Sequence, residues 1–235
     1  MAGILRLTTD LGVQIIKTDV DETGLVSLEF EGEDEEFLEN MLTREYGSVP
    51  RIQKLIVGTP YRGWLADVGK VGYGLYVDLG IRLPQRVDAL VPLFQIRSQF
   101  KMHESSARTI ADALVLVSNL PVEITISKFD ITGLTIEAKF TETMLQRIND
   151  WTSDDHERLV VLGTSKEMID RALSKSGHLQ DIFRVEELGE FEYSLVCKRS
   201  THASGIVAAM GPRLKGVPMH LFIPREVQGK TNAKT

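Results

Sequence analysis

The chain has 235 residues, of which 43% are hydrophobic, and its formal net charge is −6. A chain of this length has enough material for one to three domains with their own cores. It has no stretch near the roughly 20 apolar residues of a membrane-spanning helix and no basic start followed by an apolar run, so we expect a cytoplasmic protein with no membrane partner. Its one cysteine, Cys197, excludes an intrachain disulfide and a multi-cysteine metal site.

Charge is distributed unevenly along the chain. Residues 1–58 hold 5 basic and 12 acidic side chains, residues 59–150 hold 10 of each, and residues 198–235 hold 7 basic and 1 acidic. A phosphate backbone would therefore be met by arginines of the balanced centre and by the basic C-terminal stretch. A solvated basic tail explains the same stretch equally well.

The first 58 residues predict a small α/β unit. Alternating apolar residues predict a hairpin made of residues 12–17 and 25–30, with a turn at 19–24. An acidic run at residues 33–36 opens a predicted helix that ends near Gly47, because the helix dipole favours acids in the first turn. A solvated helix start explains this run without a metal or a basic partner.

Residues 63–79 predict two antiparallel strands that meet at a glycine-rich bend. Strand alternation places Val77 on a buried face and Tyr76 on the opposite face, and a bulge at Gly74 would bring Tyr73 beside Tyr76. Two exposed aromatic rings on a small barrel predict a stacking platform for nucleobases, since every base has a π-face.

This segment resembles the opening of a ribosomal S1-type RNA-binding domain, which is a five-stranded OB barrel. The resemblance rests on a second strand with Tyr73, Gly74, Tyr76, Val77 and Leu79, a third strand at 87–93, a short helix near 94–96, and last strands at 120–126 and 134–140. It implies that the barrel binds single-stranded RNA. Two features depart from the family pattern: Pro92 stands where a His is common, and an insertion at 81–86 adds Arg82 and Arg86.

The chain beyond the barrel predicts a second folded region. A helix at 105–116 is expected to connect the third and fourth barrel strands, a second helix at 140–151 follows the barrel, and a polar linker is expected at 152–155. The next elements follow the β-α-β-β-α-β order of a ferredoxin-like domain, a topology that the RRM shares. Phe191 and Tyr193 would be its stacking residues in an RRM, although packing in the core explains them more simply. The expected elements are strands at 159–162, 183–187, 191–197 and 219–223, with helices at 165–174 and 203–214.

Catalytic, metal and cofactor motifs find little support. The five histidines fall in different elements, and none has ligand spacing. The glycines at 69, 72 and 74 do not form a dinucleotide fingerprint, because they do not lead from a strand into a helix. The helix start at Thr201 could hold a phosphate, but capping explains it. We therefore expect no catalytic residue, metal or cofactor.

These observations together predict an α+β, multi-domain, non-enzymatic RNA-binding protein that acts with the translation, transcription, ribosome or RNA-processing machinery. The whole chain also resembles an uncharacterised archaeal family built around an S1-like barrel. The alternative is a protein-interaction or scaffold module whose barrel has lost RNA binding. Expected domains are 1–58, an S1-like barrel with a trailing helix at 59–151, a ferredoxin-like domain at 152–226 and a flexible basic tail at 227–235. Expected RNA-binding residues are Lys70, Tyr73, Tyr76, Arg82, Arg86, Arg213 and Lys215.

Overall fold

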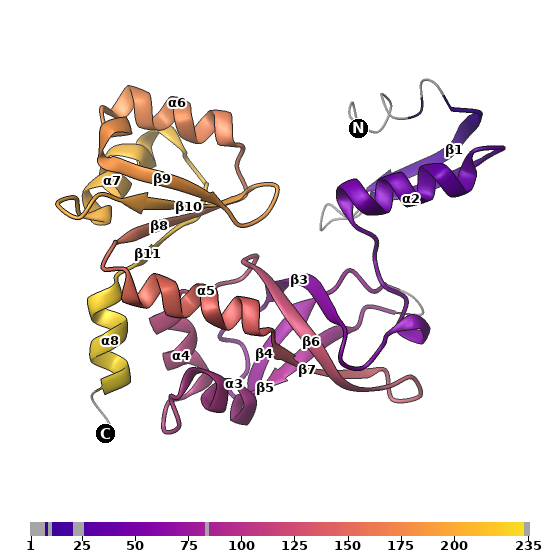
Figure 1. Ribbon diagram of the computed structural model, residues 1–235, viewed down its shortest axis with the longest axis horizontal. Helices are drawn as coiled ribbons and strands as arrows, with labels where there is room; N and C mark the ends of the chain where they lie inside the picture. The colour runs from indigo at the N-terminus through magenta and orange to yellow at the C-terminus, as the bar shows by residue number, and fades with distance from the viewer. Residues whose placement is uncertain (1–7, 9–10, 21–25, 83–84, 233–235) are drawn as a thin grey trace. The chain divides into compact units, whose positions relative to one another are not determined.

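The computed structural model describes residues 8, 11–20, 26–82 and 85–232 (Figure 1). The chain divides into two compact units, Met1–Arg51 and Ile52–Thr235. No helix among the described residues is long and apolar enough to cross a membrane.

The first unit contains an antiparallel hairpin and one helix. Strand β1 (Val13–Val20) pairs with β2 (Val26–Gly32), and helix α2 (Glu35–Tyr46) follows directly. The helix begins two residues later than the acidic run, because Asp34 occupies its N-cap position and accepts a hydrogen bond from the Gly12 N–H at 2.8 Å. Most of the expected turn lies outside the described residues, which resume at residue 26.

The second unit opens with a closed five-stranded barrel. Its strands are joined in the order β3-β4-β5-β7-β6, with β5 and β7 parallel and the other pairs antiparallel. Alternate residues fill the interior, among them Leu65, Val77 and Val91, each at most 1% exposed. The barrel elements are η1 (Ile52–Lys54), β3 (Pro60–Ala66), β4 (Gly74–Asp78), β5 (Asp88–Pro92), α3 (Leu93–Phe100), α4 (Ala107–Leu114), β6 (Pro121–Asp130) and β7 (Thr135–Phe140).

Gly74 begins strand β4 and does not form a bulge. A Cβ at this position would lie 2.5 Å from the carbonyl oxygen of Val91 and 2.7 Å from Leu90 Cδ1. The glycine is therefore required by the close approach of β5, and the expectation of a bulge here is wrong.

Helix α5 (Glu142–Ser153) connects the barrel to a four-stranded antiparallel sheet. The strands are joined in the order β11-β8-β10-β9, so the first strand in sequence is central. The elements are β8 (Arg158–Leu162), α6 (Lys166–Ser176), η2 (Leu179–Asp181), β9 (Ile182–Glu187), β10 (Glu192–Cys197), α7 (Ala203–Met210), η3 (Gly211–Arg213) and β11 (Met219–Phe222).

Both faces of this sheet are covered. On one face, Leu159 and Leu195 pack with Ile169 and Ile206 of helices α6 and α7. Tyr193 belongs to this helical core, so it is not a stacking residue on an open sheet.

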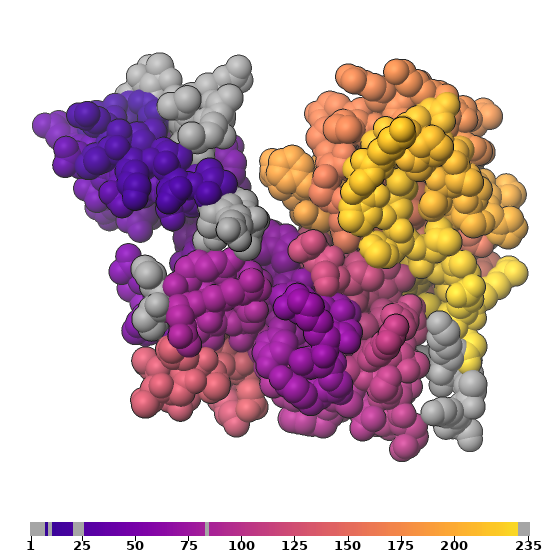
Figure 2. All heavy atoms as spheres, turned by 180° about the vertical axis from the view of Figure 1, so that it is seen from behind, coloured from indigo at the N-terminus to yellow at the C-terminus, as the bar shows by residue number. Residues whose placement is uncertain are grey.

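On the other face of the sheet, Val160, Leu162 and Phe222 join the core cluster that includes the barrel interior and Trp151 of α5. Figure 2 shows the C-terminal region in close contact with the barrel. The face that an RRM leaves open for RNA is therefore occupied by the protein itself.

The C-terminal segment forms a further helix, α8 (Pro224–Asn232), where the sequence predicted a flexible tail from residue 227. Val227 is buried in the same cluster as the barrel core, and Gln228 Nε2 donates to the carbonyl oxygen of Thr152 at 2.7 Å. The helix thus brings the chain back onto α5. Residues 233–235 lie outside the described part of the chain.

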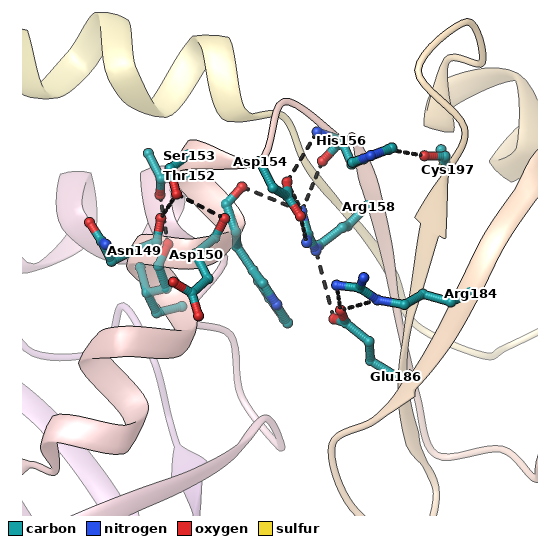
Figure 3. Close-up of polar contacts among 12 residues, drawn as sticks. Asn149, Asp150, Thr152, Ser153, Asp154, His156, Arg158, Arg184, Glu186 and Cys197 are labelled. Carbon is teal, nitrogen blue, oxygen red and sulfur yellow. Dashed lines mark hydrogen bonds and ion pairs between the residues drawn. The ribbon is translucent and has the colours of Figure 1, made fainter.

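A buried arginine holds the connection between α5 and β8 (Figure 3). Arg158 is 0% exposed, and its guanidinium donates to both carboxylate oxygens of Asp154 and lies 5.3 Å over the ring of Trp151. Glu186 of β9 completes the ion-pair network, with Oε2 3.7 Å from Arg158 Nε. Residues 152–155 are thus part of a structured junction between the barrel and the sheet.

Candidate nucleic-acid interface

Three aromatic side chains form a surface that we call the aromatic platform: Trp64 on the outer face of β3, Tyr76 on the outer face of β4, and Tyr73 just before β4. Cross-strand register pairs Leu65 with Val77 inside the barrel, so their neighbours in sequence face outward. Tyr73 is 56% exposed, Trp64 is 47% exposed and Tyr76 is half-buried. An exposed set of this kind offers apolar faces to a planar ligand.

The structure brings Tyr73 and Tyr76 into direct contact. Their hydroxyl oxygens are 2.9 Å apart, and their rings lie edge to face with centroids 6.2 Å apart. The hydrogen bond with Tyr73 and the burial of the ring raise the pKa of Tyr76 above its ordinary value, so its phenol is neutral at pH 7. Tyr73 is fixed in turn because its carbonyl oxygen accepts the Leu93 N–H at 2.8 Å, at the start of α3.

Trp64 was not among the residues expected from the sequence. Its register partner on β4 is Asp78, two residues from Tyr76, so the two rings are diagonal neighbours on one face of the sheet. The alternation of buried Gly63 and Leu65 with exposed Arg62 and Trp64 could have identified it, once the first strand was extended back to residue 60.

The two predicted arginines lie beside the platform but are already paired. Arg82 donates to Asp78 through both terminal nitrogens, at 2.9 and 3.0 Å. Arg86 bridges Asp88 at 3.0 Å and Asp78 at 3.2 Å. Burial would raise the pKa of Asp78, but the hydrogen bonds from Arg82 and the Gly80 N–H and the two guanidinium charges hold it below its ordinary value. Asp78 and Asp88 therefore offset the charge of these arginines.

Lys70 lies on the loop between β3 and β4, which leads into the platform. It forms an exposed ion pair with Asp67 at 2.7 Å. Exposed pairs of this kind are weak, so Lys70 can exchange its partner for a ligand at little cost.

Arg213 and Lys215 belong to the C-terminal region of the unit. The Arg213 guanidinium donates to the carbonyl oxygens of Ala209 at 2.7 Å and Lys175 at 3.1 Å, near the ends of α7 and α6. Among the described residues, no hydrogen bond or ion pair joins either side chain to the platform.

Sequence comparison relates the chain to one protein family. The DUF2110 central domain matches residues 55–152, and the DUF2110 C-terminal domain matches residues 156–221. These two matches to DUF2110 span the barrel with α5 and nearly all of the four-stranded sheet.

The chain was also compared with curated proteins and with solved structures. No curated protein matches the chain. Among solved structures, GSP13 from Bacillus subtilis is 20% identical over 38% of this chain and 58% of its own length, with a TM-score of 0.26.

Proposed function

We propose that the protein binds single-stranded RNA on the aromatic platform of its barrel and has no enzymatic activity, metal or cofactor. The observation that carries the proposal is the exposure of Trp64, Tyr73 and Tyr76 on one face of β3 and β4. Bases of an unpaired strand stack on such rings without sequence preference, and a paired strand does not offer its base faces.

The topology supports this assignment. The order β3-β4-β5-β7-β6 is the order of an OB fold, and we assign the barrel to its S1 type. OB folds bind oligonucleotides on the second and third strands and the adjoining loops, which here carry Tyr76 and Lys70. We assign the C-terminal sheet to the ferredoxin-like fold, from its β-α-β-β-α-β order.

The paired arginines make stacking the main source of affinity. Asp78 and Asp88 already neutralise Arg82 and Arg86, so these side chains add less attraction for phosphate than their number implies. We place the protein in the cytoplasm with the translation, transcription or RNA-processing machinery, where unpaired RNA is available.

Alanine substitution on the platform tests the proposal. Each of Trp64→Ala, Tyr73→Ala and Tyr76→Ala should weaken binding of an unstructured RNA by about 1 to 3 kcal/mol, because each removes one stacking surface. Fluorescence anisotropy gives the dissociation constants, and circular dichroism checks that each variant is folded. Tyr46→Ala is the matched control, since Tyr46 is 51% exposed on α2 of the first unit. Equal affinity of all four variants and the parent protein would refute the platform.

A protein partner on the same surface is the second candidate function. It is favoured by the local balance of charge around Asp78 and by Pro92 at the third-strand position that commonly carries a His in the S1-type domains this barrel resembles. The same variants distinguish the two functions. If the protein binds no RNA and Trp64→Ala or Tyr73→Ala abolishes co-purification of a protein partner, the interaction module is the correct assignment.

A further inference from the structure

The C-terminal region meets the barrel at Pro121, next to Trp64 of the platform. Trp64 is the register partner of Pro121 on β6, and Pro121 faces outward because Val122 points into the barrel. Gly189, in the turn between β9 and β10, lies against this proline, since a Cβ built on it would be 3.0 Å from Pro121 Cγ. The same turn also contributes Leu188, which packs against the barrel cluster.

A carboxylate lies at this contact. Glu192 Oε2 would be only 2.2 Å from a Cβ at position 189, so the side chain of Glu192 occupies the space beside Gly189. The carboxylate is half-buried and receives one hydrogen bond, from the Phe191 N–H to Oε2 at 3.3 Å. Within the described residues Oε1 accepts none. Pro121 thus lies between Trp64, its register partner on β3, and Gly189, whose other neighbour is the Glu192 carboxylate.

We propose that Trp64, Pro121 and Glu192 form a base-selective subsite, in which a nucleobase stacked on Trp64 presents its N–H donors to Glu192. This inference rests on the proposed function. Guanine fits best, because its N1–H and N2 amino group are adjacent donors that can bond to both carboxylate oxygens. Uracil fits worst, because carbonyl oxygens flank its one N–H and face the negative charge.

The negative charge of Glu192 also determines which part of the RNA lies beside it. A carboxylate repels phosphate, so the RNA backbone runs on the side of Trp64 away from the β9–β10 turn, and the base edge faces Glu192. Edge recognition of this kind acts on splayed, unpaired bases. The other two rings stack any base, so selectivity belongs to one position of the strand.

The test compares a six-residue oligouridine with six oligomers that each carry one guanine. For the parent protein, the best single-guanine oligomer should bind about tenfold tighter than oligouridine, the range expected for one two-bond base contact. Glu192→Gln keeps the shape of the side chain but removes its charge and one acceptor, so the ratio should fall close to one. Glu190→Gln is the control, since Glu190 is an exposed residue of the β9–β10 turn, two residues from Glu192, and the same charge change there should keep the ratio.

Each outcome separates the two proposals. If the parent protein binds none of the oligomers, the proposed function fails and the subsite fails with it. If it binds them in a Tyr73-dependent way but without preference for guanine, or if Glu192→Gln keeps the preference, the subsite is refuted while RNA binding on the platform stands.

Discussion

At the scale of single residues, the platform depends on small side chains as much as on aromatic ones. Gly74 lets β5 approach β4, and Gly63 lets β4 approach β3, where a Cβ would lie 2.5 Å from the Asp78 carbonyl oxygen. These contacts set the strand spacing that places Trp64, Tyr73 and Tyr76 on one face. Neither glycine has a positive φ, so it is space and not backbone strain that requires glycine.

The pair Gly74→Ala and Gly72→Ala tests this reading. Gly74→Ala should lower the free energy of unfolding by about 1 to 3 kcal/mol, because its Cβ would overlap the backbone of Val91. Gly72→Ala should leave stability unchanged or raise it slightly, since a Cβ there meets nothing within 4 Å. Urea denaturation measures both, and equal effects of the two substitutions would contradict the packing argument.

Sequence alternation predicted the residues of the platform only in part. It placed Tyr76 outward and Val77 inward, because a strand of five residues has only two faces. It did not reveal that Arg86 would also pair with Asp78, since that contact depends on β4 and β5 being neighbours. It also missed Trp64, which the hairpin pattern alone does not separate from a core tryptophan.

At the scale of elements, the turn from α5 to β8 decides how the barrel meets the sheet. The sequence indicated a polar linker, because Thr152, Ser153, Asp154 and Asp155 are all small or acidic. In the structure Asp154 instead pairs with the fully buried Arg158. A buried guanidinium needs such a partner, and only the fold shows that residue 158 is inside.

The role of Asp154 can be followed by pH. Burial would raise the pKa of this carboxyl, but the hydrogen bonds from Arg158 and the His156 N–H outweigh burial and hold the pKa below its ordinary value. A carboxyl with a lower pKa in the folded chain stabilises the fold above its unfolded pKa, and this contribution disappears as pH falls through the folded value. Asp154→Asn should therefore cost about 2 kcal/mol at pH 7 and progressively less below pH 4.

Thermal unfolding of the parent protein and Asp154→Asn across this pH range gives the measurement. Asp155→Asn is the control, because Asp155 forms an exposed pair with Arg225 at 3.5 Å and should have little effect at any pH. A cost for Asp154→Asn that is the same at pH 7 and pH 3 would show that the ion pair does not stabilise the junction.

At the scale of the whole molecule, residues from 52 onward form one compact unit in which the barrel and the C-terminal sheet share a core cluster. Local patterns predicted the order of helices and strands in this sheet, since each element has its own periodicity. They did not identify α5 and α8 as the elements that cover the face with Val160 and Phe222, because the unbroken apolar run of β8 indicates only that both of its faces are buried.

This shared cluster predicts that the sheet does not fold normally alone. A fragment of residues 154–226 lacks Trp151, whose ring lies 5.4 Å from that of Phe222, and lacks Val227, so it exposes Val160 and Leu162 to water. The fragment should melt at a lower temperature than the same region in the full chain, because apolar surface that the barrel side buries is now exposed to water. The same exposed surface should bind a hydrophobic dye. A fragment of residues 142–235 keeps α5 and α8 and should recover much of the loss. If residues 154–226 give well-dispersed amide signals and the melting temperature of the full chain, the sheet is an independent domain and the cluster adds nothing to its stability.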